Sequence, residues 1–195
     1  VYGERLYEIR NILNLNSKKI ECNNREKITI KNIENNLPID KNNNNYIAFA
    51  HHETSNGIEN NIEELTDYAK YKNNKVIVDG ISSFGGIPIE IEKLDIDYFV
   101  TSSNKCLHGL PGVSFVIAKK KTIEESKNNR KSHSLDLYDQ YKDFEHNGQF
   151  RFTPPPQIIN SLDIALDELI EQGGVEERYK RYRFYNDTLR SFLRY

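Results

Sequence analysis

Short runs of apolar, largely β-branched or aromatic residues are spaced along the middle of the chain, and they constrain its fold more than any other feature. They are residues 46–50, 75–79, 98–101 and 113–118. Each run has the length of a buried strand, and long or helical connections separate one run from the next. Such connections favour parallel strands with both faces covered. The sequence therefore predicts an α/β fold, a three-layer sandwich around a mainly parallel mixed sheet.

Apolar residues at helical spacing predict helices in segments 4–13, 62–71 and 158–169. The third segment follows three consecutive prolines, which the first turn of a helix tolerates, and Gly173-Gly174 ends it. A helix rich in Tyr and Arg closes the chain. The Asn-rich stretch at 42–45 is typical of a flexible surface loop.

Composition excludes several classes of protein. The net charge of -2 lacks the basic excess that nucleic-acid and membrane surfaces require. The apolar runs are far shorter than the ~20 residues of a membrane span, and no export signal is evident. With so few cysteines, Cys22 and Cys106 are expected to be reduced in a cytoplasmic protein. No Cys or His pair has the spacing of a metal site.

Three polar segments follow the predicted strands, at 51–57, 79–86 and 102–106. Ligands of open α/β sheets gather at the carboxyl ends of the strands, so these segments should share one rim. A lysine amine such as Lys105, beside hydroxyl donors, can form a Schiff base with an aldehyde cofactor. A carboxylate such as Asp79 can keep a pyridine nitrogen protonated. A solvated lysine and an ordinary Asp-Gly turn remain the alternatives at these two positions.

Three stretches resemble those of the class V, fold-type-I aminotransferases, which depend on pyridoxal 5'-phosphate. They read DGISSFGGIP at 79–88, DYFVTSSNKC at 97–106 and GLPGVSFV at 109–116. Further motifs that support the resemblance are YGER at 2–5, HHETSNG at 51–57, SLDLY at 134–138 and QFRFTPP at 149–155. The similarity follows the family's order along nearly the whole chain. It implies the large domain of a fold-type-I enzyme.

The resemblance implies a role for each matching residue. Lys105 matches the lysine that forms the Schiff base and moves protons. Asp79 matches the partner of the pyridine nitrogen, and Ile81 the apolar residue against the ring. Thr54 or Ser55 matches the residue that binds the ring hydroxyl, and the family's branches differ over which one does so.

The resemblance also implies phosphate ligands and a partner subunit. Ser102 and Asn104 match residues that bind the cofactor phosphate. Thr153 matches a threonine that reaches the phosphate held by the other subunit, so a homodimer is expected. Family members usually have Thr-His after the nearby proline, whereas this chain has Pro156-Gln157, which puts substrate recognition or the subunit contact in question.

The chain opens at a valine and stops inside a helical pattern, and we expect it to be a piece of a longer polypeptide. Residues 1–172 would be a partial cofactor-binding large domain. Residues 173–195 would begin the helix that leads to a C-terminal small domain. The Gly-rich phosphate turn and the arginine for the substrate carboxylate are expected outside this chain, which by itself would be inactive.

Within the family, these sequence motifs are most similar to those of the branch that moves the amino group of 2-aminoethylphosphonate to pyruvate. That reaction gives phosphonoacetaldehyde and L-alanine in phosphonate degradation. An alanine–glyoxylate or serine–pyruvate aminotransferase is the nearest alternative, with the same cofactor residues and another substrate. A cysteine desulfurase is disfavoured because a catalytic Cys loop is not evident. A non-catalytic fragment is the alternative from another class.

Overall fold

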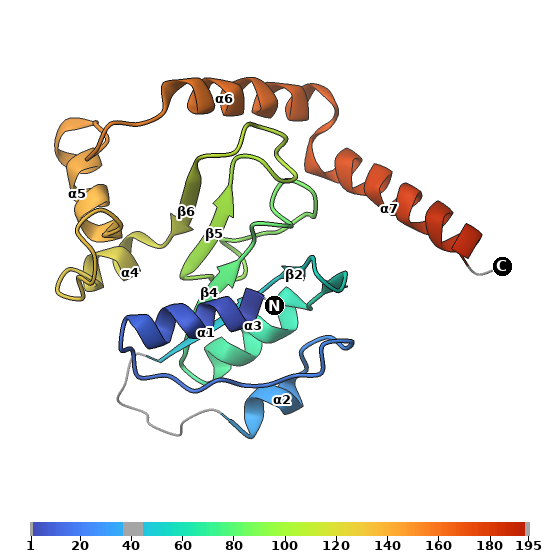
Figure 1. Cartoon of the computed structure of the whole chain (residues 1–195), viewed down its shortest axis with the longest axis horizontal. Helices are drawn as coiled ribbons and strands as arrows, with labels where there is room; N and C mark the ends of the chain where they lie inside the picture. Colours follow the sequence, from blue (N-terminus) through green and yellow to red (C-terminus); the bar gives the residue numbers. More distant parts are fainter. Residues whose placement is uncertain (1, 37–44, 194–195) are drawn as a thin grey trace. The chain divides into compact units, whose positions relative to one another are not determined.

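The computed structural model describes residues 2–36 and 45–193 (Figure 1). Most of the Asn-rich segment predicted to be a surface loop, residues 42–44, lies outside these ranges. The helices are α1 (Tyr2–Ile12), α2 (Ile30–Glu34), α3 (Ile62–Tyr71), α4 (Lys120–Glu125), α5 (Leu137–Asn147), α6 (Pro156–Glu171) and α7 (Gly174–Leu193). The strands are β1 (Tyr46–Ala50), β2 (His52–Glu53), β3 (Ile58–Glu59), β4 (Lys75–Asp79), β5 (Tyr98–Ser102) and β6 (Ser114–Ala118).

The larger sheet has the strand order β1-β4-β5-β6. Strands β1 and β4 are parallel, in a register that pairs Ile47 with Val76 and Ala50 with Asp79. Their β-branched and aromatic residues suit a pleated surface with both faces covered. Because β1 and β4 are separated by a helix rather than a tight turn, their parallel pairing is the outcome that the sequence predicted.

Main-chain hydrogen bonds give the direction of the other two strands. The N–H of Asp97 donates to the carbonyl of Val76 at 3.2 Å, and the N–H of Gly80 donates to the carbonyl of Val100 at 2.9 Å. These partners advance together, so β5 runs parallel to β4. Beside β5, Lys119 pairs with Asp97 at 3.2 Å, whereas Ser103 pairs with Val113 at 3.0 Å. Here the partners run in opposite directions, so β6 is antiparallel. The predicted mainly parallel mixed sheet in an α/β fold is confirmed.

The predicted helices are confirmed as α1, α3, α6 and α7, with ends that differ by a few residues at most. Helix α3 begins where the Asn61 side chain accepts a hydrogen bond from the N–H of Glu64 at 3.3 Å. Acidic residues in its first turn and Lys70 in its last complement the helix dipole. Pro156 occupies the first turn of α6, as the sequence predicted.

The chain divides into two compact units, each made of segments that are distant in the sequence. One unit comprises Val1–Asp79, Ile91–Phe99 and Val116–Pro154; the other comprises Gly80–Glu90, Val100–Phe115 and Pro155–Tyr195. We call them the first and second unit.

The core of the first unit forms where α3 packs against β4 (Figure 1). Leu65, Ala69, Val76 and Val78 are fully buried there. Burying a leucine or valine side chain stabilises a fold by about 1.5–3 kcal/mol, so this contact anchors the strand that ends in Asp79.

A buried carboxylate, Asp97, ties several elements of the first unit together. Its oxygens accept hydrogen bonds from the Val76 N–H at 2.8 Å, the Thr122 hydroxyl at 3.1 Å and the Lys70 ammonium. Burial by itself would raise the pKa of Asp97, but the bonds from Lys70 and Val76 outweigh it and hold that pKa below its usual range. Asp97 is therefore ionised and structural at neutral pH.

The second unit packs the turns after β4 and β5 against α6 and α7. Its buried residues include Leu107, Ala165 and Leu169, and Phe84 meets Phe115 edge-on with ring centroids 6.1 Å apart. In residues 2–36 and 45–193, none of the helices combines the length and hydrophobicity that a membrane crossing needs.

Candidate active site

Asp79, the predicted partner of a pyridine nitrogen, is the last residue of β4 and is half-buried. Its carbonyl oxygen accepts a 2.9 Å hydrogen bond from the N–H of His51, which directly follows β1. Because Val78 before it is buried and Gly80 after it is held to Val100, the main chain fixes where the Asp79 carboxylate leaves the strand. The carboxylate thus stands at the carboxyl end of a sheet strand, as predicted.

His51 is 2% exposed in the first unit. Burial, and then the nearby charges of His52 and Lys27, lower its pKa from 6.5 to about 4. The imidazole is therefore neutral at physiological pH. The sequence put His51 in a polar segment with no role assigned, and only its burial shows that it belongs to the packed end of β1.

Thr54 and Ser55, the two predicted partners of a ring hydroxyl, lie in the turn of the small β2–β3 hairpin. The turn is closed by the N–H of Gly57, which donates to the carbonyl of Glu53 at 2.9 Å with Gly57 at a left-handed φ of 70°. The Ser55 hydroxyl donates to a Glu53 carboxylate oxygen at 2.9 Å. Both Thr54 and Ser55 are exposed, so both hydroxyls lie at the surface of the first unit.

Ser102 and Asn104, the predicted phosphate ligands, belong to the second unit and contact each other. Ser102 ends β5, and its hydroxyl donates to the Asn104 side-chain oxygen at 3.0 Å. This bond leaves the two N–H groups of the Asn104 amide as donors. Between them, the buried Ser103 hydroxyl anchors the turn by donating to the carbonyl of Leu110 at 2.5 Å.

Lys105 lies in this turn, and its side chain is exposed. Its ammonium group makes no hydrogen bond or ion pair with any residue in the described part of the chain. Its main-chain carbonyl accepts a 3.0 Å bond from the N–H of His108, which closes the turn. His108 takes a left-handed φ of 66°, which costs a non-glycine residue roughly 1–2 kcal/mol. The lysine is thus a free amine on a main chain that its neighbours hold.

Ile81 begins the turn after Asp79, in the second unit, and is half-buried. The same turn meets the Lys105 turn at Cys106, whose thiol lies 3.6 Å from the carbonyl oxygen of Ser82. Burial raises the pKa of the Cys106 thiol, although the charges of Arg178 and Lys105 act against this. The thiol is therefore protonated and packed rather than nucleophilic.

Sequence reasoning missed Arg178 and Tyr182, which lie one helical turn apart on α7. Arg178 is 1% exposed and donates from Nη1 to the carbonyl oxygen of Cys106. The Tyr182 hydroxyl lies 2.8 Å from Nε2 of His108. Burial and the charges of Arg178 and Arg181 lower the pKa of His108. In the sequence both residues look like ordinary members of a Tyr- and Arg-rich helix, and no local signal marks them.

Thr153 is exposed in the segment that joins α5 to α6, in the first unit. Nearby, Arg151 is paired with Asp139 at 3.0 Å. The reach of Thr153 toward a second subunit stays a prediction.

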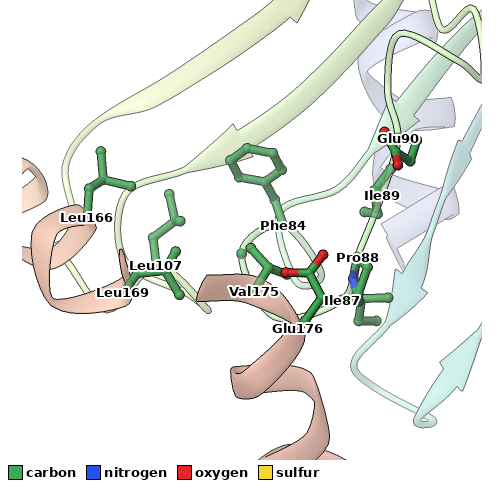
Figure 2. Close-up of a pocket in the computed structure, with 11 residues that line it drawn as sticks. Phe84, Ile87, Pro88, Ile89, Glu90, Leu107, Leu166, Leu169, Val175 and Glu176 are labelled. Carbon is green, nitrogen blue, oxygen red and sulfur yellow. The ribbon is translucent and has the colours of Figure 1, made fainter. Parts of the chain in front are cut away.

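A cavity of about 320 Å³ opens in the second unit where α7 begins (Figure 2). Its lining is mostly apolar: Phe84, Gly85, Ile87, Pro88, Ile89, Leu107, Leu166, Leu169 and Val175, with Glu90 and Glu176. It borders both turns through Gly85 and Leu107. However, none of the predicted cofactor residues lines it, so the predicted site and this cavity are separate features.

Comparison with known proteins identifies the family. The family model described as aminotransferase class-V matches residues 6–193. The chain is 38% identical over 184 residues to the 2-aminoethylphosphonate–pyruvate transaminase of Bacteroides fragilis, covering 93% of this chain and 50% of that protein. It is 41% identical over 194 residues to a bifunctional phosphonoacetaldehyde hydrolase/aminoethylphosphonate transaminase of Clostridioides difficile, covering 99% and 30% respectively.

The fold agrees with this assignment. The alanine–glyoxylate aminotransferase of a Nostoc species superposes with a TM-score of 0.81 at 20% identity, covering 97% of this chain and 50% of that one. At such low identity the likeness shows the fold alone. The chain spans about half the length of the Bacteroides relative. Since the family model covers nearly the whole sequence, the chain belongs to the class-V aminotransferase family.

Proposed function

We propose that this protein is a pyridoxal-phosphate-dependent transaminase that moves the amino group of 2-aminoethylphosphonate to pyruvate. The products would be phosphonoacetaldehyde and L-alanine. The observation that carries the proposal is the 38% identity, over 93% of the chain, to a relative with that named activity. The second relative, at 41% identity, carries a transaminase name for the same amino donor.

The residues in hand fit the proposed cofactor. Lys105 offers an exposed amine that no acidic side chain of the described residues neutralises, which is what capture of an aldehyde requires. Asn104 supplies amide N–H groups on the same turn as donors for a phosphate, and Ser102 supplies a hydroxyl that would turn its proton from the Asn104 oxygen to the phosphate. Asp79 ends its strand as a half-buried carboxylate, suited to a protonated ring nitrogen. Ile81 would rest against the ring, and Thr54 or Ser55 would bind its hydroxyl.

When bound, the cofactor would supply an electron sink for the carbon that carries the amino group. The protein's part is to hold, orient and move protons. Lys105 would bind the aldehyde and, once displaced by the substrate amine, would carry the proton between substrate carbon and cofactor. Asp79 would keep the ring nitrogen protonated. The backbone bonds from His51 to Asp79 and from His108 to Lys105 fix the main chain at both residues.

The nearest alternative substrate pair belongs to the alanine–glyoxylate and serine–pyruvate aminotransferases. The structural likeness to an alanine–glyoxylate aminotransferase does not favour it, because 20% identity speaks for the fold alone. The amino donor and acceptor therefore follow the sequence relatives. We further propose a homodimer in which Thr153 reaches the phosphate site of the second subunit.

The assignment of Lys105 is tested by chemical trapping. The purified full-length protein is mixed with pyridoxal phosphate, reduced with borohydride, digested and mapped by mass spectrometry. We expect the label on Lys105, no label at that position in Lys105→Ala, and wild-type labelling in Lys142→Ala, which removes another exposed lysine. A label spread evenly over surface lysines would contradict the assignment.

The substrate is tested separately by following amino transfer to pyruvate. In the full-length protein we expect L-alanine to form from 2-aminoethylphosphonate, and little or no product when serine is the donor or glyoxylate the acceptor. Preference for glyoxylate would instead select the alternative.

A further inference from the structure

We propose that Arg178 is a positioning residue for Lys105, acting from α7 through the main chain of the turn that carries the lysine. The inference rests on the proposed function, because that function gives Lys105 the task of binding the cofactor. Arg178, the turn and α7 all belong to the second unit.

Arg178 contacts the main chain next to Lys105. Its Nη1 donates to the carbonyl oxygen of Cys106, the residue that directly follows the lysine. Its Nη2 donates to the side-chain oxygen of Gln172 at 3.3 Å, just before α7 begins. With 1% of its surface exposed, Arg178 is closed off from any ligand. A buried guanidinium is costly unless it is hydrogen-bonded, so the bond to Cys106 is part of what makes this burial tolerable.

A second contact from the same face of α7 holds the other side of the turn. Tyr182 lies four residues after Arg178, and its hydroxyl meets Nε2 of His108 at 2.8 Å. His108 has a strained left-handed backbone, which persists only where the surroundings hold it. Cys106 and His108 are one and three residues after Lys105. Helix α7 thus contacts the turn immediately after the lysine at two points, the main-chain carbonyl of Cys106 and the side chain of His108.

The Lys105 side chain has no partner among residues 2–36 and 45–193, so its position depends on its main chain. The turn after β4 adds a third constraint, because a Cβ on Gly86 would lie 2.7 Å from the Cys106 thiol sulfur and 3.0 Å from the Tyr182 ring. Cys106 therefore sits in a closely fitted space between Gly86 and α7. Removing Arg178 should loosen the packing around Cys106 and increase the mobility of the Lys105 main chain.

The opening of the turn can be measured without any cofactor, by thiol labelling of the full chain. Cys106 reports on the turn, and Cys22, in the first unit, is an internal reference. In Arg178→Gln we expect Cys106 to react about tenfold faster or more, with Cys22 unchanged. Loss of the Arg178 charge by itself would raise the thiol pKa and slow labelling, so acceleration reports opening of the turn.

Matched variants distinguish loss of the contacts that Arg178 and Tyr182 make with the Lys105 turn, here called the clamp, from a general loss of fold. Arg190→Met removes an exposed arginine of the same helix, whose Nε donates to the Asn186 side-chain oxygen within α7, and should leave both cysteines at wild-type rates. Tyr182→Phe removes only the hydroxyl and should accelerate Cys106 to a smaller extent. It also tests the clamp if Arg178→Gln fails to fold. If Arg178→Gln folds and its Cys106 labelling rate is unchanged, the proposed clamp is refuted. If Arg178→Gln does not fold, an unchanged Cys106 labelling rate in Tyr182→Phe refutes it.

The positioning role is tested by the yield of borohydride-trapped cofactor on Lys105. We expect about a tenfold loss in Arg178→Gln, partial recovery in Arg178→Lys, which restores one donor, and no loss in Arg190→Met. Unchanged trapping in a variant whose Cys106 is opened would reduce Arg178 to a structural residue. Absence of trapping on Lys105 in the wild type would instead refute the proposed function. The Cys106 labelling rates would still test whether Arg178 and Tyr182 hold the turn.

Discussion

The N–H of His51, the residue after β1, donates a 2.9 Å hydrogen bond to the carbonyl oxygen of Asp79, the last residue of β4. On the other side of His51, its own carbonyl accepts a 2.8 Å bond from the N–H of Asn60. His51 is thus built into the main chain that carries Asp79. Its buried, neutral imidazole makes this arrangement sensitive to acid.

The stability of the protein should fall in mild acid because of His51. The unfolded chain binds the proton near pH 6.5, but the pKa in the folded chain is about 4. Between these values the unfolded state binds more protons, so stability is complete above pH 6.5 and is lost as pH falls toward 4, by about 3 kcal/mol. Urea unfolding across this range should show the slope in wild type and in His146→Gln, an exposed control, but not in His51→Gln. An equal dependence of the unfolding free energy on pH in all three proteins would contradict the role of His51.

Asp97 should contribute to stability in a lower pH range. Its pKa is depressed in the folded state, so its contribution is complete above the unfolded value near 3.9 and disappears as pH falls below it. Asp97→Asn should lose about 2 kcal/mol at pH 7, because the Lys70 ammonium loses its buried partner. Thermal unfolding at pH 7 and pH 3 measures both effects. Asp187→Asn, on the exposed surface of α7, should match wild type, and a loss as large as that of Asp97→Asn would contradict a specific role.

Gly86→Ala should destabilise the protein and disturb the Lys105 turn. The new Cβ would lie 2.7 Å from the thiol sulfur of Cys106 and 2.8 Å from its Cβ, closer than real contacts allow. We expect a loss of roughly 1–3 kcal/mol from such overpacking. Gly3→Ala is the control, since a Cβ there meets nothing within 4 Å and alanine favours the helix. Calorimetry of both variants is decisive: similar melting temperatures would show that the second unit relaxes around Gly86.

Asp79→Asn should separate cofactor capture from turnover. The variant keeps Lys105, so borohydride trapping should continue. Transamination by the full-length protein should fall by orders of magnitude, because a neutral amide does not hold the ring nitrogen protonated and each pKa unit of lost support is worth about 1.4 kcal/mol. Asp67→Asn, an exposed carboxylate on α3, is the matched control. Turnover near that of wild type in Asp79→Asn would refute the assigned role.

Much of the fold could be read from the sequence because the signals are local. The β-branched residues of β4 predict a strand wherever it is placed, and the spacing of apolar residues predicts α3 and α6. The resemblance to the family supplied the candidate residues. Short or polar elements gave no such signal: α2, α4, α5 and the β2–β3 hairpin were not predicted, because tertiary contacts rather than periodicity stabilise them.

The sequence by itself determined that Asp79 and Lys105 follow successive strands of a mainly parallel sheet, because strand propensity and order along the chain are local properties. Only the tertiary structure decided how the Lys105 turn is held. The partner of Arg178 is a main-chain carbonyl 72 residues away, and an arginine within a helix looks the same in sequence whether it is buried or solvated. The burial that makes His51 neutral is likewise a property of packing, since a side chain's pKa depends on what the folded chain places around it.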